Sequence, residues 1–146
     1  MLLRHGLCLR FGGDTMPRRS KARAEDAIQR TVFQHFRQRS APGVVAWHTP
    51  SGGYRKPVEA AIFKGLGVMP GVSDILAVRP AACQCGRSHL DFFALELKAA
   101  GGRATEAQME YIHRINAAGG YGVVAFGLDE ALRCLEAWGL LKGRAS

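Results

Sequence analysis

The sequence predicts an α/β fold in which helices flank a mixed β-sheet. Apolar residues recur every four positions over residues 24–38, which is typical of an amphipathic helix. Two apolar runs, 74–78 and 90–98, indicate strands separated by a polar loop, and a strand-helix-strand passage extends over residues 90–126. Because a short loop joins antiparallel strands and a helical crossover joins parallel ones, we expect both kinds of pairing in one sheet.

The first half of the chain carries signals for two helices and one strand. Ile28, Val32 and Phe36 lie on one face of the first helix, with charged residues between them. The next elements, in order, are a break at 40–43, a short strand over 44–49, a turn-rich segment, and a second helix that starts at Pro57, continues to Leu66 and is ended by Gly65 or Gly67.

The second half contains the strands 74–78 and 90–98, which we expect to pair as an antiparallel hairpin. Thr105 and Gln108 have the spacing of a capping box, which predicts the start of a helix. The remaining elements, in order, are the end of that helix at Gly119–Gly120, a fully buried strand over 121–126, and a last helix over 130–140 capped by Asp129.

The size of the chain predicts one domain with a tail. Its 146 residues match the usual length of a single domain. We expect a basic, flexible N-terminal arm over 1–23 and a folded domain over 24–146. No apolar run is long enough to span a bilayer, and the first residues lack the pattern of a signal peptide, so we expect a cytoplasmic protein, nucleoid-associated or phage-encoded.

The net charge of +8 is concentrated near the start of the chain. Residues 1–39 hold nine Arg or Lys against three acids, whereas residues 40–146 hold eleven against nine. Such a density of cations favours a polyanionic partner, because neutralising phosphates releases condensed counterions. A solvated basic tail explains the same charge. The basic residues that would contact a phosphate backbone are Arg18, Arg19, Lys21, Arg23, Arg55, Lys56 and Arg103.

The cysteines are too few for a disulfide framework. Cys83 and Cys85, with His89 nearby, suggest a metal cluster, but a structural zinc site commonly uses CxxC spacing and four ligands. A zinc site is therefore the weaker interpretation of this segment.

The predicted hairpin brings acidic and basic groups together. If Arg79 pairs with Asp91, antiparallel register sets Asp74 opposite Glu96. Lys98 is two residues from Glu96 in a strand, so both side chains point to the same face. Two facing carboxylates resist joint ionisation unless a cation lies between them. Because Mg²⁺ prefers carboxylates, waters and phosphate oxygens, this corner of the sheet is a candidate metal site.

These residues form a pattern that resembles a known family. The motif stretches are Gly71-Val72-Ser73-Asp74, Glu96-Leu97-Lys98 and Thr105-Glu106-Ala107-Gln108, and the likeness extends over roughly residues 24–135. The sequence resembles the VRR-NUC family of the PD-(D/E)xK nuclease superfamily, although Ser73 stands where a proline is usual. The resemblance implies a restriction-endonuclease-like core.

The resemblance also implies roles for individual residues. Asp74 and Glu96 would be metal ligands, with the backbone carbonyl of Leu97 as a further ligand, and Lys98 would be the catalytic lysine. Gln108 would orient Lys98 or the metal ligands, although its place in the capping box accounts for it equally well.

Family members use another glutamate from the first helix. Glu25 stands in the matching place, beside Asp26, and would be an additional metal ligand. Glu59, on the second predicted helix, is a rival for this role.

The implied activity is a Mg²⁺- or Mn²⁺-dependent endonuclease that hydrolyses phosphodiester bonds in DNA. Stand-alone members of the family are homodimers that cut branched DNA such as four-way junctions, so DNA and a second copy of the chain are the expected partners. Two alternatives stay open: a non-catalytic nucleic-acid-binding module with this fold, and a nuclease that cleaves RNA.

Overall fold

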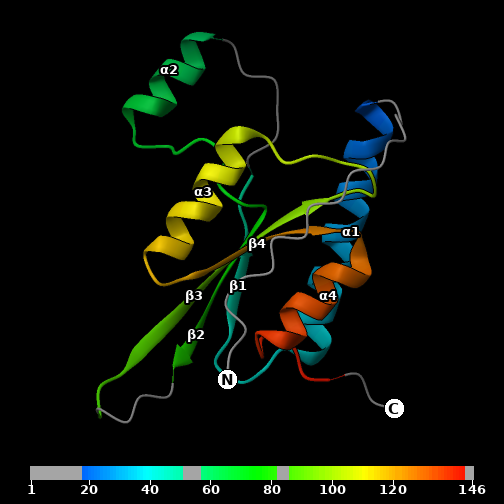
Figure 1. Ribbon diagram of the computed structural model, residues 1–146, viewed down its shortest axis with the longest axis vertical. Coiled ribbons are helices and arrows are strands. Elements are labelled where there is room, and N and C mark those ends of the chain that lie inside the picture. Colours follow the sequence, from blue (N-terminus) through cyan, green and yellow to red (C-terminus); the bar gives the residue numbers. More distant parts are fainter. Residues whose placement is uncertain (1–17, 51–56, 82–85, 144–146) are drawn as a thin grey trace.

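The computed structural model describes residues 18–50, 57–81 and 86–143. Helices and strands follow one another along the chain in the predicted order (Figure 1). The elements are α1 (Arg18–Arg39), β1 (Val45–His48), α2 (Pro57–Gly65), β2 (Ile75–Ala81), β3 (His89–Lys98), α3 (Glu106–Ala117), β4 (Tyr121–Phe126) and α4 (Leu128–Ala137).

The four strands form one sheet in the order β1-β2-β3-β4. β1 and β3 both pair with β2 in antiparallel orientation, whereas β4 pairs with β3 in parallel orientation across the α3 crossover. The predicted α/β class, with a mixed sheet flanked by helices, is confirmed. No helix in the described ranges combines the length and the apolar character that a membrane span requires.

The register of the β2–β3 hairpin is the predicted one. Arg79 pairs with Asp91, and Ile75 pairs with Leu95 at the other end of the ladder. The side chains of Arg79 and Asp91 also form an ion pair of 2.7 Å. Asp74, the residue before β2, therefore lies next to Glu96.

Alternating side chains of the central strands contact two different helical layers. Ile75, Phe93 and Leu95 point into the larger core, which they share with α1 and α4. Leu76 and Ala94 point to the other face, where they pack against α3. Figure 1 shows α3 on one side of the sheet and α1 with α4 on the other. Asp74, Glu96 and Lys98 are separated from Leu76 and Ala94 by even numbers of residues or ladder positions, so their side chains also point to the face that α3 covers.

Two predictions about the end of the chain were wrong. Residues 121–126 do form a strand, but only Ala125 is buried, and Phe126 is 39% exposed. The reason is that β4 is an edge strand. Asp129 does not cap the last helix, because the chain turns at Gly127, with φ of 84°, and the helix begins at Leu128. Asp129 lies in the first turn instead.

The first helix starts earlier than predicted. α1 begins at Arg18, so residues 18–23, which the sequence suggested as part of a flexible arm, are helical. Tertiary contacts explain why the helix extends over these residues. Lys21 Nζ donates a hydrogen bond of 3.2 Å to the carbonyl of Gly101, and the Glu25 carboxylate accepts one from the amide of Ala99. Both acceptor and donor lie just after β3. The rest of the predicted arm, residues 1–17, lies outside the described residues.

Candidate active site

Asp74 is held between the two strands that flank β2. Its Oδ2 accepts a hydrogen bond of 2.9 Å from the amide of Leu97 in β3. Its backbone carbonyl accepts a hydrogen bond of 3.0 Å from the amide of Thr49. The same carbonyl oxygen lies 2.9 Å from Nδ1 of His48, at the end of β1. The carboxylate is thereby fixed at the end of the β3 strand, beside Glu96.

Gly71 brings the segment before Asp74 against the start of α3. Its φ is 75°, a backbone conformation that is unfavourable for residues other than glycine. A Cβ at this position would also lie 2.2 Å from the carbonyl oxygen of Ala107. The two motif stretches around Gly71 and Ala107 are therefore in direct contact. Only glycine permits this approach.

Glu96 is a fully buried carboxylate with one oxygen unsatisfied. Its exposed fraction is 0%. Oε1 accepts a hydrogen bond of 2.7 Å from Lys98 Nζ and another from Gln108 Nε2. Oε2 has no hydrogen-bond partner among the described residues. A buried oxygen of this kind is costly unless a further ligand satisfies it.

The charge state of Glu96 reflects this environment. Burial and, to a smaller extent, the nearby Asp74 carboxylate raise the pKa of its carboxyl from 4.5 to about 7, against the opposing effect of Lys98. The hydrogen bond from the amide of Leu97 to Asp74 Oδ2 and the strand register both place the two carboxylates next to each other. The predicted convergence of two acids and one lysine is thus present in the fold.

Lys98 and Gln108 complete the group around Glu96. Lys98 is only 8% exposed and forms an ion pair of 2.7 Å with Glu96. Gln108 makes the predicted capping box. Its side-chain Oε1 accepts a hydrogen bond of 2.8 Å from the backbone N of Thr105, and its backbone N donates one of 3.3 Å to Thr105 Oγ1. Gln108 therefore has both roles, because its Nε2 also reaches Glu96.

Glu25 and Glu59 occupy different places. Glu25 Oε1 accepts 3.3 Å from the amide of Ala99, directly after Lys98, so this carboxylate lies at the same end of β3 as the site. Glu59 is exposed on α2, which Figure 1 shows standing away from the sheet. The geometry favours Glu25. Within the described ranges, however, no three His, Cys, Asp or Glu side chains gather closely enough to bind a metal by themselves.

The structure describes only some of the basic residues that were predicted to contact nucleic acid. Arg23 and Arg103 are exposed, whereas the ammonium of Lys21 is used in its contact with Gly101. Arg18 and Arg19 belong to the first turn of α1. Arg55 and Lys56 lie outside the described residues. So do Cys83 and Cys85, which the sequence suggested as possible metal ligands.

Sequence reasoning did not predict the burial of Ser73 or the contacts that His48 and Thr49 make with Asp74. Ser73 is 0% exposed, and its hydroxyl has no partner among the described residues. His48 and Thr49 hold the Asp74 backbone from β1. The position of Ser73 next to the acidic residue was a signal, but nothing in the pattern of residues 44–49 indicated a contact with Asp74.

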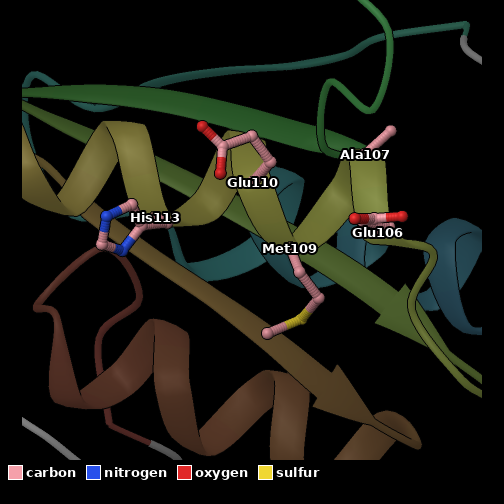
Figure 2. Close-up of a pocket in the computed structure, with 5 residues that line it drawn as sticks. All are labelled: Glu106, Ala107, Met109, Glu110 and His113. Carbon is pink, nitrogen blue, oxygen red and sulfur yellow. The ribbon is translucent and has the colours of Figure 1, made fainter.

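A shallow depression lies on the exposed side of α3, away from the carboxylate pair. Figure 2 shows its lining residues along the helix: Glu106, Ala107, Met109, Glu110 and His113. None of them is a predicted site residue. Because Glu106 and Glu110 are exposed acids on one helix face, this surface repels phosphate.

Comparison with known proteins supports a nuclease-like fold. No protein-family model matches the chain, and no curated protein matches it. A solved structure described as a VRR_NUC domain protein is similar, with a TM-score of 0.57 and 25% sequence identity over 77% of this chain and 85% of that one. The chain thus shares the fold of a VRR_NUC domain protein, as its sequence motifs led us to expect.

Proposed function

We propose that this protein is a metal-dependent endonuclease that hydrolyses phosphodiester bonds in DNA, with branched DNA as its preferred substrate. One observation carries the proposal: the buried Glu96 carboxylate lies beside Asp74, its Oε2 has no hydrogen-bond partner in the described part of the chain, and Lys98 is bound to its other oxygen. A protein that only bound nucleic acid would gain nothing from this costly arrangement. The fold shared with a VRR_NUC domain protein supports the same class of activity.

The residues present fit a hard divalent cation. Carboxylate and carbonyl oxygens are the ligands that Mg²⁺ and Mn²⁺ prefer, and the unsatisfied Oε2 of Glu96 is such a donor. Asp74, Glu96 and the carbonyl of Leu97 would hold the ion, with waters and substrate phosphate completing its shell and Glu25 as an additional carboxylate. When bound, the ion would supply Lewis-acid stabilisation of charge on the phosphate and a water of lowered pKa.

Lys98 and Gln108 position the reacting groups. Lys98 carries its ammonium at the site by pairing with Glu96 Oε1, where it can neutralise charge that develops on a phosphate. Gln108 fixes the same oxygen from the first turn of α3. Both donors hold Glu96 in one orientation, which leaves its Oε2 available to a ligand.

The test is cleavage by purified variants in Mg²⁺ or Mn²⁺. We expect Asp74→Ala, Glu96→Gln and Lys98→Ala to lose at least about a hundredfold in cleavage rate while keeping DNA affinity within a few-fold, because each removes a group at the reacting centre. Asp129→Asn, which alters an exposed carboxylate on α4, is the matched control and should cleave normally.

Substrate choice separates this proposal from its rivals. Linear, flapped and four-way DNA should be compared with RNA of the same sequence. Preferential cleavage of the four-way substrate supports the proposal, whereas preferential cleavage of RNA would replace it. Binding of DNA by the wild-type protein without cleavage in either metal would identify a binding module.

The same proposal includes a homodimer, which the exposed apolar surface of α2 supports. Val58 and Ile62 of α2, with Leu66 directly after the helix, recur every four residues and are 71%, 56% and 73% exposed. Burying side chains of this size contributes about 1.5 to 3 kcal/mol each, so a second copy would stabilise this surface. Light scattering should give a dimer mass for the wild type and a monomer mass for Ile62→Glu. A monomeric wild type would remove the dimer from the proposal.

A further inference from the structure

Three arginines form a line along the outer surface of α1. Arg23, Arg30 and Arg37 are all exposed and are spaced by seven residues. Seven residues are nearly two helical turns, so successive side chains are offset by only about 20° and are displaced by about 10.5 Å along the axis. The apolar residues of α1 that enter the core lie on the opposite side of the helix: Ile28, Val32 and Phe36.

This line differs from the arginines that have a structural role. Arg39, also on α1, pairs with Glu136 at 2.7 Å, and Arg79 pairs with Asp91. Arg23, Arg30 and Arg37 form no ion pair with any residue that the structure describes. Their guanidinium groups therefore remain available to an anion from solution.

The neighbouring helices do not offer such a surface. The exposed side of α3 carries Glu106 and Glu110. The first turn of α4 carries Asp129 and Glu130. These carboxylates outnumber the exposed arginines of the same helices, Arg114 of α3 and Arg133 of α4, so a phosphate backbone is attracted to the outer face of α1 rather than to α3 or α4.

The first arginine of the line is level with the site along α1 but lies on the other side of the helix. Arg23 is two residues from Glu25, whose carboxylate contacts Ala99 at the end of β3, and side chains two residues apart on a helix point in nearly opposite directions. Arg37 lies about 21 Å further along the helix. At about 3.4 Å per base pair, this distance corresponds to roughly six base pairs of duplex.

We infer that Arg23, Arg30 and Arg37 form a track for the phosphate backbone of a duplex, which follows the outer face of α1 for about six base pairs. This inference rests on the proposed function for the identity of the polymer. Arg30 and Arg37 were not among the contacts that the sequence suggested. The exposed Asp26, four residues before Arg30, reduces the charge of the track but does not cancel it.

The experiment measures the salt dependence of duplex binding. The variant Arg23→Gln/Arg30→Gln/Arg37→Gln removes three positive charges with little change in helix propensity. The control Arg87→Gln/Arg133→Gln/Lys142→Gln removes three exposed positive charges elsewhere. Affinity for a duplex of about 30 base pairs is measured in EDTA between about 50 and 200 mM NaCl, and the thermal unfolding of each variant is recorded.

We expect the track variant to reduce the slope of log affinity against log salt by about 2.7, which is about 0.9 for each lost phosphate contact. The control should keep most of the wild-type slope. Equal slopes for the two variants, with both folded like the wild type, would overturn the track.

This outcome is independent of the nuclease proposal. A wild-type protein that binds duplex steeply but cleaves no substrate would refute the proposed activity and leave the track intact. Normal cleavage together with an unchanged slope in the track variant would refute the track alone. Restoring the slope with Arg→Lys at the three positions would show that charge, rather than helix stability, is responsible.

Discussion

Replacing Glu96 by Gln should make the protein more stable at alkaline pH. Gln has the shape of the protonated carboxyl and can still accept from Lys98 and Gln108, but it carries no charge. In the wild type, burial and the Asp74 carboxylate raise the pKa of Glu96 from 4.5 to about 7. Between these two values the folded protein retains a proton that the unfolded chain has released.

The sign and size of the effect follow from this difference. Because the unfolded chain binds fewer protons, the stability contributed by protonated Glu96 is complete below pH 4.5 and is lost as pH rises through about 7. A pKa difference from 4.5 to about 7 corresponds to about 3 kcal/mol, at about 1.4 kcal/mol per unit. The Glu96→Gln variant does not lose this stability. The difference in free energy of unfolding between the variant and the wild type should therefore grow by about 3 kcal/mol, in favour of the variant, as the pH rises over this range.

The assay is urea unfolding of both proteins in EDTA at several pH values from about 4.5 to 8.5, with Asp129→Asn as the control for removing an exposed carboxylate. The free-energy gap between Glu96→Gln and the wild type should widen with pH, while the control runs parallel to the wild type. A gap that is constant over this range would refute the assignment of Glu96 as a buried acid of raised pKa.

Two further predictions concern the metal and the turn before Asp74. Mg²⁺ at about ten times its dissociation constant should stabilise the wild type by about 1.4 kcal/mol near pH 8 and should not stabilise Glu96→Gln. Equal stabilisation of both proteins in urea titrations would show that the ion binds elsewhere. Gly71→Ala should destabilise the protein by more than about 2 kcal/mol, because its Cβ would lie 2.2 Å from the Ala107 carbonyl oxygen. Gly67→Ala has a similar φ of 85° but open space around its Cβ, so thermal unfolding should show only the smaller backbone cost of about 1 kcal/mol.

Much of the local structure could be predicted because it depends on short-range rules. The capping box of Thr105 and Gln108 forms as its spacing indicates. The pairing of Arg79 with Asp91 also follows, since antiparallel register in a hairpin is fixed by the loop and by alternation of apolar residues. The hairpin register alone sufficed to bring Asp74 next to Glu96.

Other features depended on contacts between distant segments. α1 extends back to Arg18 because its first turns meet the chain after β3, and no pattern within residues 18–23 reveals that contact. β4 is less buried than its apolar sequence suggested, because its place at the edge of the sheet is set by topology.

By itself, the sequence determined the order of the elements, the hairpin register and the identity of the acidic and basic groups at its end. Only the tertiary structure decided that Glu96 is fully buried, that Gln108 reaches it from α3, and that one carboxylate oxygen has no partner within residues 18–50, 57–81 and 86–143. The physical reason is that alternation along a strand fixes the direction of a side chain. Its solvation, and hence its charge, depends on what the rest of the chain packs above it.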